Sequence, residues 1–117
     1  PVLAFHGTAD RGVPYERSTD EYMGVPETVE FWVRANHCGA ELEVEAVGGE
    51  GEGLPVQRLS YPGCAPGSEV TLYRIEGGGH QWPGGAALRE RQFGSISTAI
   101  SASQIMWEFF ARYSLPE

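Results

Sequence analysis

The chain has 117 residues, of which 41% are hydrophobic, and its formal net charge is −8 at pH 7. This composition supplies a core for one small domain and excludes an intrinsically disordered chain. Nucleic acids and anionic membrane surfaces are bound through Lys and Arg, so we expect no nucleic-acid partner, and no segment is long and apolar enough to predict a membrane span.

The first predicted element is an apolar strand over Pro1–Phe5, which lacks alternation and is therefore expected to be buried on both faces. A natural N-terminus would rarely expose such a strand. The sequence also opens without an initiating Met or a signal peptide. We therefore expect the chain to be the C-terminal part of a longer domain.

A helix and three strands are predicted next. Pro26 and two nearby glutamates favour a helix over residues 25–36. Its expected apolar stripe consists of Val25, Val29, Trp32 and Val33. Alternation predicts a strand over residues 42–46 with one solvent-exposed face. Two further strands, over residues 56–61 and 69–75, are predicted to form an antiparallel hairpin.

The last predicted element is a helix that runs from Ser101 to about Tyr113. Ser101 and Gln104 have the spacing of a capping box. The expected buried face consists of Ile105, Met106, Phe109 and Phe110. Together these elements predict an α/β fold in which a mixed sheet is flanked by helices.

A carboxylate follows the first strand, at Asp10. The end of a buried strand is where α/β enzymes place reactive groups, and Asp10 could orient an imidazole there and stabilise its cation. The alternative is that Asp10 caps a turn or the following helix, since Asp is common at such positions.

A histidine, His80, follows three glycines and precedes Trp82 and Pro83. Imidazole moves protons near neutral pH, and the glycines permit a close backbone approach. An ordinary surface-loop histidine is the alternative. We expect a hydrogen-bonded structural role for His6 and a helix-capping role for His37. A metal site formed by His6, Asp10 and His80 is not expected, because no pair has helical ligand spacing, and no cofactor is predicted.

The two cysteines, Cys38 and Cys64, do not have the spacing of a zinc motif. From the residues alone they are either two separate thiols or a disulfide. Both lie in turns rich in Gly and Pro. A bridge between these turns would stabilise the fold by roughly 3–4 kcal/mol and would indicate an oxidising compartment.

A nucleophile to complete a Ser-Asp-His triad is missing. The serine of α/β-hydrolases lies in a Gly-x-Ser-x-Gly turn, and this pattern does not occur; Gly94–Ser97 comes nearest. The chain order in these enzymes is serine, acid, histidine. We therefore expect the serine and the oxyanion hole to lie upstream of Pro1.

The sequence resembles the C-terminal part of secreted α/β-hydrolases of the polyhydroxybutyrate depolymerase and feruloyl/acetylxylan esterase family. The resemblance covers nearly the whole chain, and its most specific element is the glycine-histidine-tryptophan-proline segment. The matching segments are Pro1–Asp10 with Val13–Tyr15, Cys38-Gly39 after a helix containing Trp32, Tyr61–Cys64, Val70–Gly85 and Ile105–Phe110. The chain departs from the family at Arg11-Gly12, where the family loop is often more apolar, and in the acidic segment 48–53.

The resemblance implies that residues 1–117 are the C-terminal portion of one α/β-hydrolase catalytic domain. It implies that Asp10 is the triad acid, that His80 is the base, that Cys38 and Cys64 form a disulfide and that the protein is secreted. Trp82 is expected either to line the substrate pocket or to anchor its loop. The expected partners are the upstream half of the domain and a polyester or a plant cell-wall polysaccharide ester.

Two other functions remain open at this point. A serine peptidase of the same fold can also place His-Gly-x-x-Asp before a late histidine. A non-catalytic secreted module could use Trp82 as an aromatic platform for a glycan.

Overall fold

Four strands form one mixed sheet, in the order β1-β4-β3-β2, in the computed structural model, which describes residues 1–48 and 53–115. The strands are β1 (Val2–Gly7), β2 (Glu43–Val47), β3 (Val56–Tyr61) and β4 (Val70–Ile75). Strand β3 is antiparallel to both β2 and β4, which confirms the predicted hairpin of β3 and β4, whereas β1 is parallel to β4. Most of the acidic segment 48–53, namely residues 49–52, lies outside the described residues.

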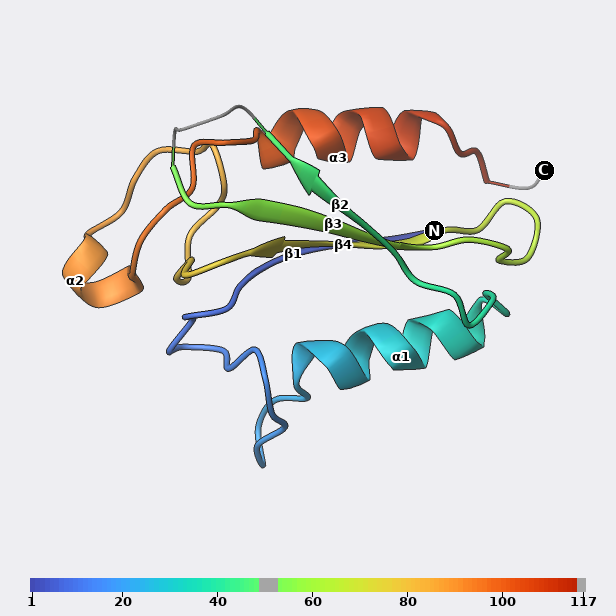
Figure 1. Ribbon diagram of the computed structural model, residues 1–117, viewed down its shortest axis with the longest axis horizontal. Coiled ribbons are helices and arrows are strands. Elements are labelled where there is room, and N and C mark those ends of the chain that lie inside the picture. Colours follow the sequence, from blue (N-terminus) through green and yellow to red (C-terminus); the bar gives the residue numbers. More distant parts are fainter. Residues whose placement is uncertain (49–52, 116–117) are drawn as a thin grey trace.

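The parallel pairing sets the position of the candidate site. Gly7 is paired with Ile75, so β1 and β4 end at the same edge of the sheet. The loop that carries Asp10 and the loop that carries His80 therefore begin side by side, as Figure 1 shows for the segments that leave these two strands.

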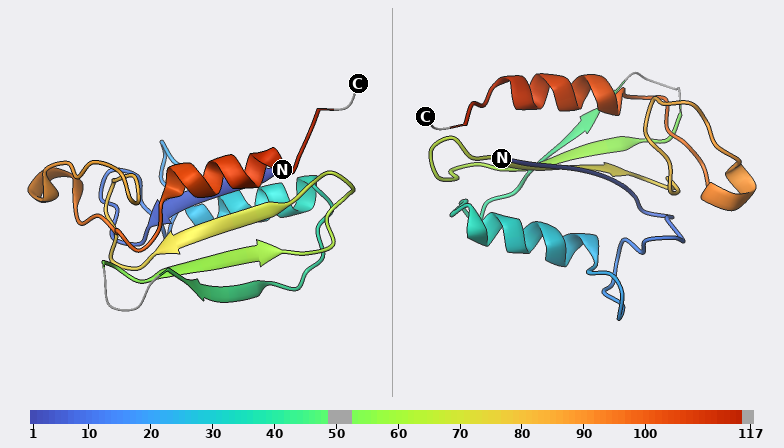
Figure 2. Two further views of the ribbon diagram at one scale, coloured as in Figure 1. Left: turned by 90° about the horizontal axis from the view of Figure 1, so that it is seen from above. Right: turned by 180° about the vertical axis from the view of Figure 1, so that it is seen from behind.

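Helices cover both faces of the sheet. Helix α1 (Val25–Ala35) lies against one face and α3 (Ala102–Ala111) against the other, with the short α2 (Glu90–Phe93) beyond the edge where β1 and β4 end (Figure 1). The structure thus shows the expected α/β arrangement of a mixed sheet with flanking helices. The two further views in Figure 2 show the same three layers.

Strand β4 supplies core residues to both faces. Val70 and Leu72 pack in the cluster on the α1 side, together with Val25 and Val29. Tyr73 belongs to the cluster on the α3 side, with Val56 and Ile75. Each fully buried Val or Leu stabilises the fold by about 1.5–3 kcal/mol, and β4 is the most buried of the four strands.

Two expectations about strand burial are wrong. Strand β1 is half-buried along most of its length rather than buried on both faces, because it lies at the edge of the sheet in the described part of the chain. Strand β2 is exposed on both faces rather than one, and Val44 is 54% exposed. Helix α3 lies over β1 and leaves β2 uncovered, as the view from above in Figure 2 shows.

Two expectations about the helices also need correction. Trp32 in α1 is 40% exposed, while Val25 and Val29 are buried as predicted. In α3, Met106 and Phe110 are 41% and 45% exposed, and Phe109 is the one residue of the predicted apolar face that is buried. Burial in both helices is confined to the narrow stripe that meets the sheet.

The predicted capping box is half formed. The Ser101 hydroxyl accepts a hydrogen bond from the Gln104 backbone, but the Gln104 side chain donates to Glu108 instead of returning to Ser101. The C-terminal end of α3 is held by Glu69, whose carboxylate accepts hydrogen bonds from Arg112 and Tyr113.

Cys38 and Cys64 form a disulfide across 26 residues of sequence. This decides between the two possibilities that the residues alone left open. The bridge joins the end of α1 to the β3–β4 turn, and a backbone hydrogen bond from Gly39 to Pro62 accompanies it.

Among the described residues, no helix is long and apolar enough to cross a membrane.

Candidate active site

Asp10 lies three residues beyond the end of β1. The backbone leaves the strand through hydrogen bonds from Thr8 to Ile75 and from Ala9 to Gly78, so the loop stays close to the end of β4. The Asp10 side chain is only 4% exposed. A buried carboxylate needs hydrogen-bond partners for both oxygens.

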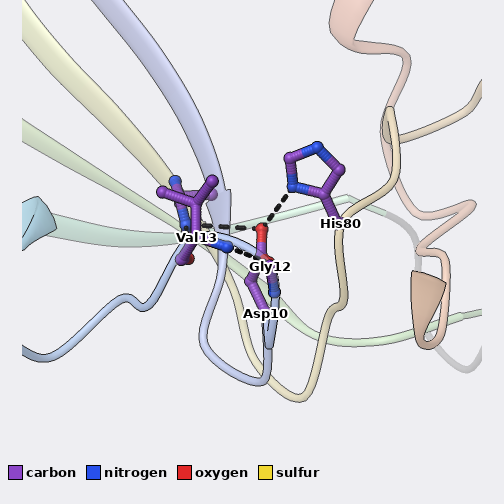
Figure 3. Close-up of polar contacts among 5 residues, drawn as sticks. Asp10, Gly12, Val13 and His80 are labelled. Atoms are coloured by element: carbon purple, nitrogen blue, oxygen red, sulfur yellow. Dashed lines mark hydrogen bonds and ion pairs between the residues drawn. The ribbon is translucent and has the colours of Figure 1, made fainter. Parts of the chain in front are cut away.

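The two oxygens of Asp10 have different partners. Oδ1 accepts hydrogen bonds from the backbone N–H groups of Gly12, at 2.8 Å, and Val13, at 2.9 Å. Oδ2 lies 2.9 Å from Nδ1 of His80 (Figure 3). The turn-capping role and the imidazole-orienting role, which the sequence offered as alternatives, are therefore both present.

The glycines before His80 permit close contact between backbones. A Cβ atom at Gly79 would lie 2.1 Å from the carbonyl oxygen of Phe93, and one at Gly7 would lie 2.1 Å from that of Gly78. The His80 backbone N–H donates to the same Phe93 carbonyl at 2.6 Å. Larger residues at these positions would force the His80 loop away from the end of β1.

The His80 ring is fixed on one side and open on the other. Its Nδ1 atom meets Asp10, while the remaining ring nitrogen points away from the carboxylate (Figure 3). The side chain is 57% exposed. Because Nδ1 donates to the carboxylate, Nε2 carries the lone pair and can accept a proton from a group outside the described residues.

The electrostatics of Asp10 suit this arrangement. Burial alone raises the pKa of the Asp10 carboxyl, but the hydrogen bonds from Val13, His80 and Gly12 and the attraction of the His80 charge outweigh it. The net pKa is lowered from its ordinary value of 3.8, so Asp10 is ionised at neutral pH. An ionised carboxylate stabilises the imidazolium that forms when His80 accepts a proton.

Trp82 both anchors its loop and lines a hollow beside His80. Its indole Nε1–H donates to the Ser103 hydroxyl at 2.9 Å, and its ring centroid lies 5.4 Å from that of Phe5. The hollow has a volume of about 310 Å³ and is lined by Phe5, His6, Asp10, His80, Trp82 and Leu88, among others. The anchoring contacts of Trp82 are present, and its role in a substrate pocket stays a prediction.

His6 is part of the support for Asp10, which the sequence did not predict. Its Nε2 atom lies 2.8 Å from the carbonyl oxygen of Val13 and 3.5 Å from Oδ2 of Asp10. The hydrogen-bonded structural role expected for His6 is confirmed, and the structure adds that it closes the Asp10 turn.

His37 lies just after α1, with a positive φ of 53°. Its backbone N–H donates a hydrogen bond to the Arg34 carbonyl, so His37 caps the helix through its main chain.

The remaining components of a triad are not found in the described part of the chain. No serine hydroxyl there hydrogen-bonds to His80; Ser95, in the segment nearest to the expected motif, donates to Glu90. Residues 1–48 and 53–115 also hold no cluster of three or more side chains suited to a metal ion.

The chain matches no family model, no curated protein and no solved structure.

Proposed function

We propose that this chain supplies the acid and the base of a Ser-Asp-His triad that hydrolyses carboxylic esters. The observation that carries the proposal is the 2.9 Å contact between Asp10 Oδ2 and His80 Nδ1, with the other ring nitrogen left accessible beside a hollow. A buried carboxylate on one imidazole nitrogen and an open second nitrogen form the acid–base half of such a triad.

The proposed reaction has two stages. His80 Nε2 accepts the proton of the attacking serine hydroxyl as the Ser Oγ–carbonyl carbon bond forms. It then returns that proton to the alcohol oxygen as the ester C–O bond breaks. Water attacks the acyl-serine with the same proton transfers, which releases the carboxylic acid and regenerates the serine. Asp10 keeps the Nδ1 proton in place through both stages, so Nε2 is the ring atom that accepts and returns the proton.

The serine and the oxyanion hole belong, in this proposal, to a preceding part of the same α/β-hydrolase domain. Strand β1 is half-buried and is parallel to β4, which suits the addition of further strands beside it. The chain resembles polyhydroxybutyrate depolymerases and feruloyl or acetylxylan esterases. The proposed substrates are therefore polyesters or esters of plant cell-wall polysaccharides.

Secretion is part of the proposal. The Cys38–Cys64 disulfide supports it, because such bonds persist in oxidising compartments outside the cytosol. An extracellular location would also give the enzyme access to polymeric esters.

The test uses the full-length protein and a 4-nitrophenyl ester. We expect His80→Ala to lower kcat by about 10⁴-fold or more, because the proton acceptor is removed. His37→Ala is the matched control, since His37 is an exposed histidine away from the site, and it should retain normal turnover. Normal turnover in His80→Ala would reject the proposal, and hydrolysis of peptides but not esters would support a peptidase instead.

A further inference from the structure

Two hollows flank the His80 ring, and they differ in chemistry. The larger one contains the apolar side chains of Phe5, Trp82 and Leu88. The smaller one, of about 210 Å³, is lined by Ala9, Arg11, Gly12, His80, Gln92, Phe93 and Gly94. Of the described residues, His80 alone lines both hollows, so the two hollows adjoin the same ring.

Arg11 is the only basic side chain, apart from the histidines, among the described residues that line either hollow. All eight Lys and Arg positions of the chain are Arg. Four of these arginines pair with carboxylates of the protein: Arg34, Arg58, Arg74 and Arg112. Within residues 1–48 and 53–115, Arg11 is in no ion pair.

The adjacent carboxylate does not neutralise Arg11 by direct contact. Asp10 is fully engaged by the backbone of Gly12 and Val13 and by His80. Arg11 therefore lines the smaller hollow without an ion pair to a carboxylate of the described residues. A guanidinium has planar, paired donors that match a carboxylate, and a charge-assisted pair of this kind is stronger than a neutral hydrogen bond.

We propose that Arg11 selects ester substrates that carry a carboxylate. The carboxylate binds to Arg11 in the smaller hollow, the ester lies at His80, and the apolar part of the substrate lies against Phe5 and Trp82. This inference rests on the proposed esterase function, because His80 defines where the ester is placed. Arg11 would then be a specificity-determining residue of a chain whose overall charge otherwise repels anions.

The test compares matched charged and neutral esters with the full-length protein. For a carboxylate on the acyl side, the pair is 4-nitrophenyl hemisuccinate and 4-nitrophenyl butyrate. For a carboxylate on the alcohol side, the pair is 4-acetoxybenzoate and 4-acetoxybenzamide. The quantity measured is the ratio of kcat/KM for the charged ester to that for the neutral one, and the pair with the larger ratio shows which side the carboxylate occupies.

We expect the ratio of one pair to fall by about tenfold or more in Arg11→Gln, the loss that one charge-assisted pair predicts. Arg11→Lys should retain part of the preference, because it keeps the charge without the paired donors. The matched control is Arg91→Gln, an exposed arginine of α2 that lines neither hollow, and it should leave both ratios unchanged. Ratios that are the same in the wild type and Arg11→Gln would overturn the inference while leaving the esterase intact.

A binding measurement separates this inference from the proposed function. Calorimetric titration with 4-hydroxybenzoate, 4-hydroxybenzamide and succinate requires no catalysis. Preferential binding of a carboxylate that is lost in Arg11→Gln supports the Arg11 site even if no ester is hydrolysed. Equal binding by the wild type and Arg11→Gln contradicts it.

Discussion

Oδ2 of Asp10 lies 2.9 Å from Nδ1 of His80, although 70 residues separate them in the sequence. The contact exists because β1 and β4 are parallel neighbours that end at one edge of the sheet. Close backbone packing of Gly7 against Gly78 holds the two loops together there.

The first prediction concerns the tautomer of His80. In Asp10→Asn, the amide oxygen can still accept the hydrogen bonds of Gly12 and Val13, so the turn should persist. The amide N–H₂ would face Nδ1 of His80, however, and would favour the tautomer whose Nε2 cannot accept a proton. We expect kcat for ester hydrolysis by the full-length protein to fall by about 10⁴-fold while the variant remains folded at neutral pH. Retention of kcat within about tenfold would refute the role of Asp10.

The second prediction concerns stability in acid. The lowered pKa of Asp10 means that its ionised form stabilises the fold above the ordinary value of 3.8, and that this stabilisation is lost as the pH falls through the lower folded value. The difference in free energy of unfolding between the wild type and Asp10→Asn should therefore shrink between about pH 5 and pH 2. Urea denaturation across this range measures it, and a constant difference would contradict the assigned carboxylate contacts.

The third prediction concerns the close approach at Gly79. A methyl group there would meet the Phe93 carbonyl, so Gly79→Ala should displace the His80 loop, abolish most activity and destabilise the protein by about 1–3 kcal/mol. Gly67→Ala is the control, because it has no atom within 4 Å but has a positive φ of 75°. It should cost about 1–2 kcal/mol of backbone strain and leave kcat unchanged. Equal kcat values in the two variants would be inconsistent with this packing.

The fourth prediction concerns His6, which closes the Asp10 turn through the Val13 carbonyl. We expect His6→Phe to lower kcat by about 10- to 100-fold while KM changes little, because a shifted Asp10 misorients His80. His6→Gln keeps a side-chain N–H donor and should recover part of the rate. If both variants lose the same activity, or if KM changes instead of kcat, His6 does not act by positioning Asp10.

The fifth prediction concerns the disulfide. Replacement of both Cys38 and Cys64 by Ser should lower the free energy of unfolding by roughly 3–4 kcal/mol, because the bridge closes a loop of 26 residues. The bridge lies at the opposite end of the sheet from Asp10 and His80, so kcat at 25 °C should be unchanged (Figure 1). Thermal and urea unfolding measure the first effect, and an unchanged melting temperature would contradict it.

Local patterns predicted the four strands, helices α1 and α3, and the pairing of β3 with β4, but not the short α2. They also singled out Asp10 and His80, because a carboxylate after an apolar strand and a histidine after three glycines are unusual in themselves. The sequence did not predict that β1 would be half-buried or that Met106 and Phe110 would be exposed. Burial of these residues depends on which elements pack beside them, and a periodic pattern cannot specify that.

The sequence also did not predict the contacts that surround Asp10 and His80. The contact of His6 with Val13 arises from a tight turn whose geometry is set by Asp10 itself. The position of Arg11 beside His80 depends on the meeting of two loops that are far apart in the chain.

The most direct test of the central claim is to map the residue of the full-length protein that a fluorophosphonate labels. The reagent reacts with a serine whose proton an adjacent histidine accepts. We predict a single adduct, on a serine upstream of Pro1, whose formation is lost in His80→Ala and retained in His37→Ala. An adduct on a serine within residues 1–117, or one that forms equally well without His80, would contradict the claim that Asp10 and His80 serve an upstream nucleophile.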